Sequence, residues 1–207
     1  MKIIAIIGQR GSGKSFLCKR LMEVLPNSTK MSFADGLKLL AQAHYSVNRE
    51  TIDSLTFKET PKPTTLNPID VASCQQIFGV IIPEKHLYTD FTSPRHFMQY
   101  FGTEILRNID PDIHINRMVK ELDKTKSDFV LIDDCRFQNE FNLLSGYDFL
   151  SAYLEHPTPI QDQGNLHPSE SYIPQLATQC QIQGTRSNLF NKIKGSLNER
   201  NFFQKNE

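Results

Sequence analysis

The sequence "KIIAIIGQRGSGKSFL" spans residues 2–17 and decides the fold of this protein. Its first six residues are a short β-branched run, which is typical of a strand buried on both faces of a parallel sheet. Residues 8–15, "GQRGSGKS", match the pattern G-x-x-x-x-G-K-[ST]. Apolar positions then recur at helical spacing over residues 14–25. A glycine-rich loop between a strand and a helix turns its backbone N–H groups toward phosphate groups, so the stretch predicts a phosphate-binding loop.

Strands and helices alternate along the rest of the chain. Further strands are expected at 29–33 and 128–134, within "YDFLSAYLE" (147–155), and at 178–183. This alternation predicts an α/β protein with three layers, a five-stranded parallel sheet flanked by helices. Residues 48–92 are broken by prolines and are expected as a helical or irregular insertion within one domain that covers 1–207.

The sequence "VLIDDCRF" (130–137) supplies a second part of the expected site. An apolar strand that ends in a carboxylate provides a magnesium partner in phosphate-loop enzymes, so Asp133 and Asp134 are the metal candidates together with Ser15. The two carboxylates should point to different faces if the strand alternates. Arg136 has two interpretations, a clamp on the transferred phosphate or a salt bridge with Glu140 at a helix start.

The helix expected over 94–108 has one face of unusual composition. Its apolar residues share one arc, whereas the opposite face carries Arg, Gln, Gly and Thr instead of the Lys and Glu of an ordinary solvated face. The candidates for binding a phosphorylated ligand on this face are Arg95, Gln99, Thr103 and Arg107.

The charge distribution limits both the partners and the cations of the site. The chain has 23 basic and 23 acidic residues, which argues against stable binding to nucleic acid or to an anionic membrane. Residues 137–185 contain no Lys or Arg, so any cation that stabilises a transferring phosphoryl group must come from elsewhere. The charge distribution leaves Arg10, Lys14, Arg95, Arg107 and Arg136, of which Lys14, Arg136 and Arg10 are the catalytic candidates. Four scattered cysteines and the lack of a signal peptide pattern indicate a cytoplasmic protein, and a homodimer stays open.

Several motifs together resemble the deoxynucleoside monophosphate kinases of bacteriophages. They are "GQRGSGKS", "SFADGLK" (32–38), "RHFMQYFGTEILRN" (95–108), "DDCRFQNE" (133–140) and "HPSE" (167–170). The resemblance implies a P-loop kinase that moves the γ-phosphoryl group of ATP, with Mg²⁺, to a deoxynucleoside monophosphate in the host cytoplasm, and so supplies DNA precursors.

The resemblance also implies roles for individual residues. ATP would be bound by Gly8, Gly11, Ser12, Gly13, Lys14 and Ser15, and the turn "QGT" with Gly184 and Thr185 would lie beside the adenine. Asp35 and Lys38 would lie near the acceptor, and Arg95, Gln99, Thr103 and Arg107 would shape its pocket. Asp134 and Arg136 would serve the reaction centre.

Two features depart from the pattern of this family. The lid-like segment 155–172 contains no Arg, although this family often has Arg there, and residues 48–92 match only weakly, so the sequence does not give the base preference. The alternative functions are a kinase for another small phosphorylated acceptor, such as phosphomevalonate, and a non-kinase nucleotide switch or ATPase. A GTPase would need an N-K-x-D element, and "NKIK" (191–194) lacks the Asp.

Overall fold

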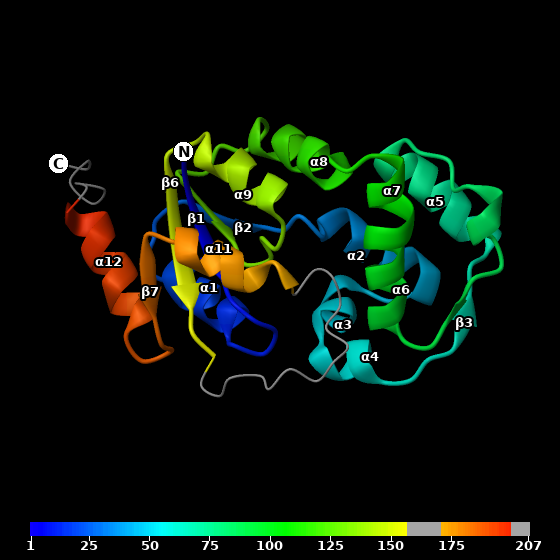
Figure 1. Cartoon of the computed structure of the whole chain (residues 1–207), viewed down its shortest axis with the longest axis horizontal. Coiled ribbons are helices and arrows are strands. Elements are labelled where there is room, and N and C mark those ends of the chain that lie inside the picture. Colours follow the sequence, from blue (N-terminus) through cyan, green and yellow to red (C-terminus); the bar gives the residue numbers. More distant parts are fainter. Residues whose placement is uncertain (157–170, 200–207) are drawn as a thin grey trace. The chain divides into compact units, whose positions relative to one another are not determined.

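The computed structural model describes residues 1–156 and 171–199. Its chain divides into two compact units, one formed by residues 1–32 and 124–207 and the other by residues 33–123. The expected insertion 48–92 lies wholly inside the second unit. Most of the expected lid-like segment, residues 157–170, lies outside the described residues. Figure 1 gives the elements of both units.

The first unit is built on a five-stranded parallel sheet, which confirms the predicted fold class. Its strands lie in the order β2-β5-β1-β6-β7, and every pairing is parallel. Each strand of this sheet is joined to the next by a connection that includes at least one helix. The strands are β1 (Lys2–Ile7), β2 (Ser28–Met31), β5 (Phe129–Ile132), β6 (Phe149–Leu154) and β7 (Ile182–Gly184).

Helices flank this sheet because its three central strands, β5, β1 and β6, are buried on both faces. Alternate residues of β1, Ile4 and Ile6, share one core cluster with the apolar sides of α1 and α12, while α11 lies along β1 (Figure 1). The helices of this unit are α1 (Lys14–Met22), α9 (Gln138–Ser145), α11 (Ile173–Gln179) and α12 (Leu189–Glu199). The strand expected at 178–183 was placed too early, because Thr178 and Gln179 still belong to α11.

The second unit is mainly helical. A two-stranded antiparallel ribbon of β3 (Thr64–Thr65) and β4 (Asp90–Phe91) accompanies its helices. The helices are α2 (Asp35–Tyr45), α3 (Arg49–Asp53), α4 (Leu55–Glu59), α5 (Pro68–Phe78), η1 (Glu84–His86), α6 (Pro94–Tyr100), η2 (Phe101–Leu106), α7 (Arg107–Ile109) and α8 (Ile113–Leu122).

An aromatic core holds the second unit together. Phe91, Phe97 and Phe101 are buried, with ring centroids 5.0 Å apart for Phe91–Phe97 and 4.7 Å apart for Phe97–Phe101. The His44 ring stacks on Phe97 at 4.3 Å, and its Nδ1 lies 2.8 Å from the buried carboxylate of Asp70. The polar groups of this core are therefore paired mainly within one helix pair, α2 and α5.

The helix expected over 94–108 is interrupted. Residues 101–106 form a π-helical turn between α6 and α7. Such a turn inserts an extra residue into the helical repeat and rotates the residues that follow it. Gly102, expected on the polar face, is consequently buried, and a Cβ there would lie 2.8 Å from Cδ1 of Leu37.

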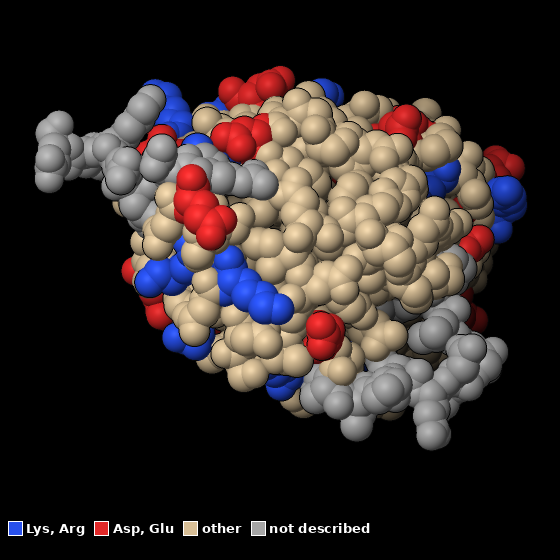
Figure 2. Space-filling model, turned by 60° about the vertical axis from the view of Figure 1, so that its left-hand side comes forward, with Lys and Arg blue, Asp and Glu red and all other residues tan. Residues whose placement is uncertain are grey.

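The surface carries both signs of charge. Figure 2 shows basic and acidic side chains around a broad area formed by other residues. Within residues 1–156 and 171–199, none of the helices has the length and apolar character that a membrane span requires.

Candidate active site

The glycine-rich loop connects the end of β1 to the start of α1, as its sequence predicts. Gly11 and Gly13 have φ values of 76° and 102°, which residues with a side chain rarely adopt. A Cβ on Gly8 would lie 2.7 Å from the carbonyl oxygen of Leu154 on β6. Glycine is therefore required at these three positions by backbone conformation or by close packing.

The side chains of the loop differ in their surroundings. The Lys14 ammonium donates to the carbonyl oxygens of Gly8 and Gln9, both at 2.7 Å, and so lies against its own loop. Ser12 is fully buried, and its hydroxyl has no hydrogen-bond partner among the described residues. Arg10 is exposed in the loop.

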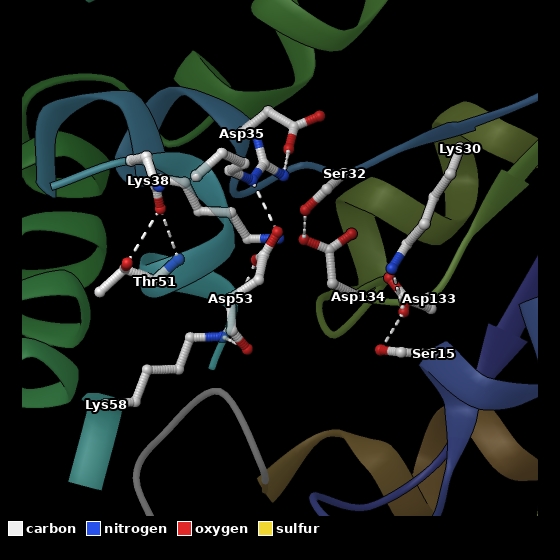
Figure 3. A network of polar contacts seen from close by, with 12 residues as sticks. Ser15, Lys30, Ser32, Asp35, Lys38, Thr51, Asp53, Lys58, Asp133 and Asp134 are labelled. Atoms are coloured by element: carbon white, nitrogen blue, oxygen red, sulfur yellow. Dashed lines mark hydrogen bonds and ion pairs between the residues drawn. The ribbon is translucent and has the colours of Figure 1, made fainter. Parts of the chain in front are cut away.

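A hydrogen bond joins the loop to the end of β5. The Ser15 hydroxyl donates to Oδ2 of Asp133 at 2.6 Å, across 118 residues of sequence. Lys30, on the neighbouring strand β2, places its ammonium 2.7 Å from the same oxygen (Figure 3). Burial lowers the pKa of Lys30, but the charge of Asp133 outweighs this effect, so the pKa lies above its usual value.

Asp134 points to a different partner. Its Oδ2 accepts a hydrogen bond from the hydroxyl of Ser32, which follows β2 (Figure 3). The two carboxylates thus have different partners. Both follow Ile132, the last residue of β5, so the strand alternation from which the divergence was predicted does not extend to them. Asp133 is the one that accepts the hydrogen bond from Ser15.

The oxygen atoms of Ser15 and Asp133 suit a magnesium ion. Mg²⁺ prefers oxygen ligands and is commonly held by one or two protein groups together with substrate phosphates. No cluster of three or more His, Cys, Asp or Glu side chains in the described part of the chain could chelate a metal alone. Ser15 and Asp133 are two such oxygen-bearing groups, held 2.6 Å apart.

Arg136 and Glu140 lie at the start of α9. The buried carboxylate of Glu140 accepts hydrogen bonds from the backbone N–H groups of Arg136, at 2.8 Å, and of Phe137, at 3.2 Å. These bonds satisfy N–H groups that have no partner within the helix. Glu140 thus has a structural role in these backbone hydrogen bonds at the start of α9.

The expected adenine turn, residues 183–185, overlaps the end of β7, which includes Gln183 and Gly184. The backbone N–H of Thr185 donates to Oδ1 of Asn188 at 3.0 Å. A Cβ on Gly184 would lie 2.3 Å from that same oxygen. Gly184 is therefore needed for the close approach of Asn188, which closes the turn before α12.

In the second unit, two of the expected acceptor residues belong to one ionic network. Asp35 accepts a hydrogen bond at 2.5 Å from Arg49, whose Nε donates to Asp53 at 2.8 Å. Lys38 lies 2.9 Å from the other oxygen of Asp53 (Figure 3). Burial raises the pKa of Asp53, but Lys38 and Arg49 outweigh it and hold the pKa below its usual range.

The other expected acceptor residues follow one another along α6, η2 and α7. Arg95 pairs with Glu59 of α4, and Arg107 donates to the carbonyl of Pro111 at 3.2 Å. Gln99 and Thr103 are half-buried on the same run. The network of α2 and α3 and this run both belong to the second unit, whereas the loop and Asp133 belong to the first.

Comparison with known proteins decides the family. A model of the deoxynucleotide monophosphate kinase family matches residues 27–183. The chain belongs to this family. The kinase is also 26% identical over 212 residues to the deoxynucleoside-5'-monophosphate kinase of Escherichia phage T5, covering 83% of this chain and 85% of that protein.

The resemblance stated from the motifs is thus confirmed. The chain is a nucleoside monophosphate kinase whose family phosphorylates deoxynucleoside monophosphates. Residues 8–15 precede the matched range, so the assignment of the loop depends on its strand–loop–helix setting and on the bond between Ser15 and Asp133.

Sequence reasoning missed three residues of this kinase. Lys30 and Ser32 contact the two carboxylates at the end of β5, and Arg186 donates to two carbonyls of the loop. The partners of all three lie more than 100 residues away in sequence. The position of Lys30 and Ser32 at the end of a strand beside β5 was the signal that could have identified them.

Proposed function

We propose that this kinase transfers the γ-phosphoryl group of ATP directly to the phosphate of a deoxynucleoside monophosphate. The hydrogen bond between Ser15 and Asp133 carries the proposal, because it joins the phosphate-binding loop to the carboxylate that a magnesium ion needs. ATP would be bound by Gly8, Gly11, Ser12, Gly13, Lys14 and Ser15, with Gly184 and Thr185 beside the adenine.

In this proposal Ser15 and Asp133 hold Mg²⁺, and Asp134 orients the end of β2 through Ser32. The ion would neutralise negative charge on the phosphate oxygens. Lys14 would exchange the carbonyls of Gly8 and Gln9 for phosphate oxygens of the donor. Arg136 and Arg10 supply further positive charge for the transferred group, which is how phosphoryl transfer is mainly accelerated.

The acceptor is assigned to the second unit. Arg95, Gln99, Thr103 and Arg107 would bind the monophosphate along one helical run, and Asp35 and Lys38 would contact it from α2. The acceptor phosphate is already an anion, so no general base is required. The enzyme has to align two nucleotides and to exclude water, which would otherwise hydrolyse ATP.

Family membership favours this function over the other readings of the motifs. The name of the phage T5 relative and the family description both specify deoxynucleotide monophosphates. A phosphomevalonate-like acceptor, a nucleotide switch and an ATPase have no comparable support.

A coupled assay for ADP formation tests the proposal. ATP, Mg²⁺ and a panel of nucleoside and deoxynucleoside monophosphates should give ADP only when a deoxynucleoside monophosphate is present. Lys14→Ala should reduce kcat/KM by about 100-fold or more, because one preorganised charge contact is worth that much. ADP formation that is independent of every monophosphate would contradict the proposal.

A further inference from the structure

Arg186 lies in the turn between β7 and α12 and contacts the backbone of the phosphate-binding loop. Its Nη2 donates to the carbonyl oxygen of Gly11, and its Nε donates to the carbonyl oxygen of Ser12. A Cβ on Gly13 would lie 2.9 Å from Nε. The glycine at 13 therefore serves a second purpose besides its backbone conformation, since it lets the guanidinium reach the loop.

Contacts on these carbonyls orient the N–H groups of the loop. No peptide bond in the described residues is cis, and in a trans peptide the C=O and N–H groups point in opposite directions. A cation that holds the carbonyls of Gly11 and Ser12 directs the N–H groups of the next residues, Ser12 and Gly13, away from itself. The Ser12 N–H also donates to the carbonyl of Gln9 at 3.2 Å, which closes the turn.

We infer that Arg186 is a positioning residue for the phosphoryl donor. Its two donors fix two successive peptide units of the loop, so that the turn closed by the Ser12 N–H and the direction of the Gly13 N–H are set before the nucleotide binds. The inference rests on the proposed role of residues 8–15 in binding ATP. A hydrogen bond from a cation to a carbonyl oxygen also polarises the whole peptide unit. The N–H group on the other side of that unit then becomes a stronger hydrogen-bond donor.

The chemistry at this position favours arginine. A guanidinium presents several donors in a rigid plane and can bond two neighbouring carbonyls at once, whereas an ammonium acts as a single point charge. Arg186 is also the first cation after the Lys- and Arg-free stretch 137–185. It is adjacent to Thr185 in the expected adenine turn, so it connects the two parts of the donor site.

The exposure of Arg186 makes this role separable from folding. The residue is exposed, and exposed polar contacts contribute little to the free energy of unfolding. Lys192 provides a matched control on α12, since its exposed ammonium donates at 2.7 Å to the carbonyl of Gln183, which belongs to β7 and not to the phosphate-binding loop.

Calorimetric titration of wild type, Arg186→Gln, Arg186→Lys and Lys192→Gln with ADP and with a deoxynucleoside monophosphate tests the inference. Arg186→Gln should weaken ADP binding by about tenfold or more, as expected when a binding group is displaced. Arg186→Lys should weaken ADP binding by an intermediate factor, because lysine keeps the positive charge but does not have the planar set of donors that bonds both carbonyls at once. Lys192→Gln should bind ADP within about twofold of wild type, and all variants should bind the monophosphate as wild type does.

Thermal melts of the same proteins complete the experiment. An Arg186→Gln protein that binds ADP as wild type does would overturn the inference, as would an equal loss of ADP affinity in Lys192→Gln. If Arg186→Gln does not fold, the same comparison is made with Arg186→Lys. If wild type binds no ADP, the proposed function itself fails. If wild type binds ADP and Arg186→Gln binds it equally well, only the inference about Arg186 fails.

Discussion

At the scale of single residues, the two carboxylates after β5 illustrate how neighbours acquire different roles. Asp133 is nearly buried and accepts hydrogen bonds from Ser15 and Lys30, whereas Asp134 is half-buried and bonded to Ser32. The contact of Asp133 with Ser15 connects it to the phosphate-binding loop, and the contact of Asp134 with Ser32 connects it to the end of β2.

This difference predicts unequal effects of two isosteric substitutions. Asp133→Asn should lower kcat/KM by about 100-fold and raise the Mg²⁺ concentration needed for half-maximal activity, because a charged oxygen ligand is lost. Asp134→Asn should cause a smaller loss and leave the Mg²⁺ requirement near that of wild type. Magnesium titrations of steady-state activity check the pair, and an increased requirement in Asp134→Asn alone would reverse the assignment.

At the scale of elements, the run from α6 to α7 differs most from its prediction, which was one regular helix over residues 94–108. Its apolar positions Phe97, Phe101 and Ile105 are buried as the helical spacing predicts. The π-helical turn that contains Gly102 was not predictable, because the spacing of the apolar residues does not reveal an extra residue in the helical repeat. Gly102 is buried close to Leu37 of α2, where a Cβ would lie 2.8 Å from Cδ1.

Substitution of Gly102 tests this packing. Gly102→Ala should lower the free energy of unfolding by about 1–3 kcal/mol, since the new Cβ would overlap Cδ1 of Leu37 in a filled core. Gly195→Ala in α12 is the control, because a Cβ there meets nothing within 4 Å, and it should stabilise the protein by up to about 1 kcal/mol. Urea unfolding of both variants measures the difference, and a stabilised Gly102→Ala would contradict the role of the contact.

The same turn is connected to a buried histidine on α8. Nε2 of His114 lies 3.4 Å from the carbonyl oxygen of Gly102. Burial, reinforced by the charge of Arg107, lowers the pKa of His114 to about 4. The folded protein therefore holds this imidazole neutral at pH values where the unfolded chain binds a proton.

The stability of the protein should depend on this histidine at acidic pH. Because the pKa is lower in the folded state, the contribution is full above pH 6.5 and is lost as the pH falls toward 4, up to roughly 3 kcal/mol. His114→Gln should lose less stability than wild type between pH 7.5 and pH 4.5. Urea midpoints at both pH values check this, and parallel losses in the two proteins would exclude His114 as a cause.

At the scale of the whole molecule, the expected site residues divide between the two units. The loop, Asp133, Asp134 and the turn at Gly184 belong to the unit with the parallel sheet, and the acceptor candidates from Asp35 to Arg107 belong to the helical unit. A kinase that aligns two nucleotides has a use for such a division. In the proposed function, each ligand would stabilise the protein through its own set of residues.

This division predicts separable effects on thermal unfolding. At about 100 times its Kd, either ADP or a deoxynucleoside monophosphate should raise Tm by roughly 5–10 °C. Lys14→Ala should reduce the shift caused by ADP and keep the shift caused by the monophosphate, whereas Arg95→Gln should do the reverse. Differential scanning fluorimetry measures all four shifts, and loss of both shifts in either variant would contradict the division.

The sequence by itself determined the sheet, the loop and the family, because these depend on local patterns. Apolar runs predict buried strands, the glycine spacing predicts a phosphate-binding loop, and the motifs order them along the chain. Tertiary structure alone decided which side chains meet. Lys30 on Asp133, Ser32 on Asp134 and Arg186 on the loop join segments far apart in sequence, and such contacts depend on strand order, which brings β2 and β5 together and places β7 at the other edge of the sheet.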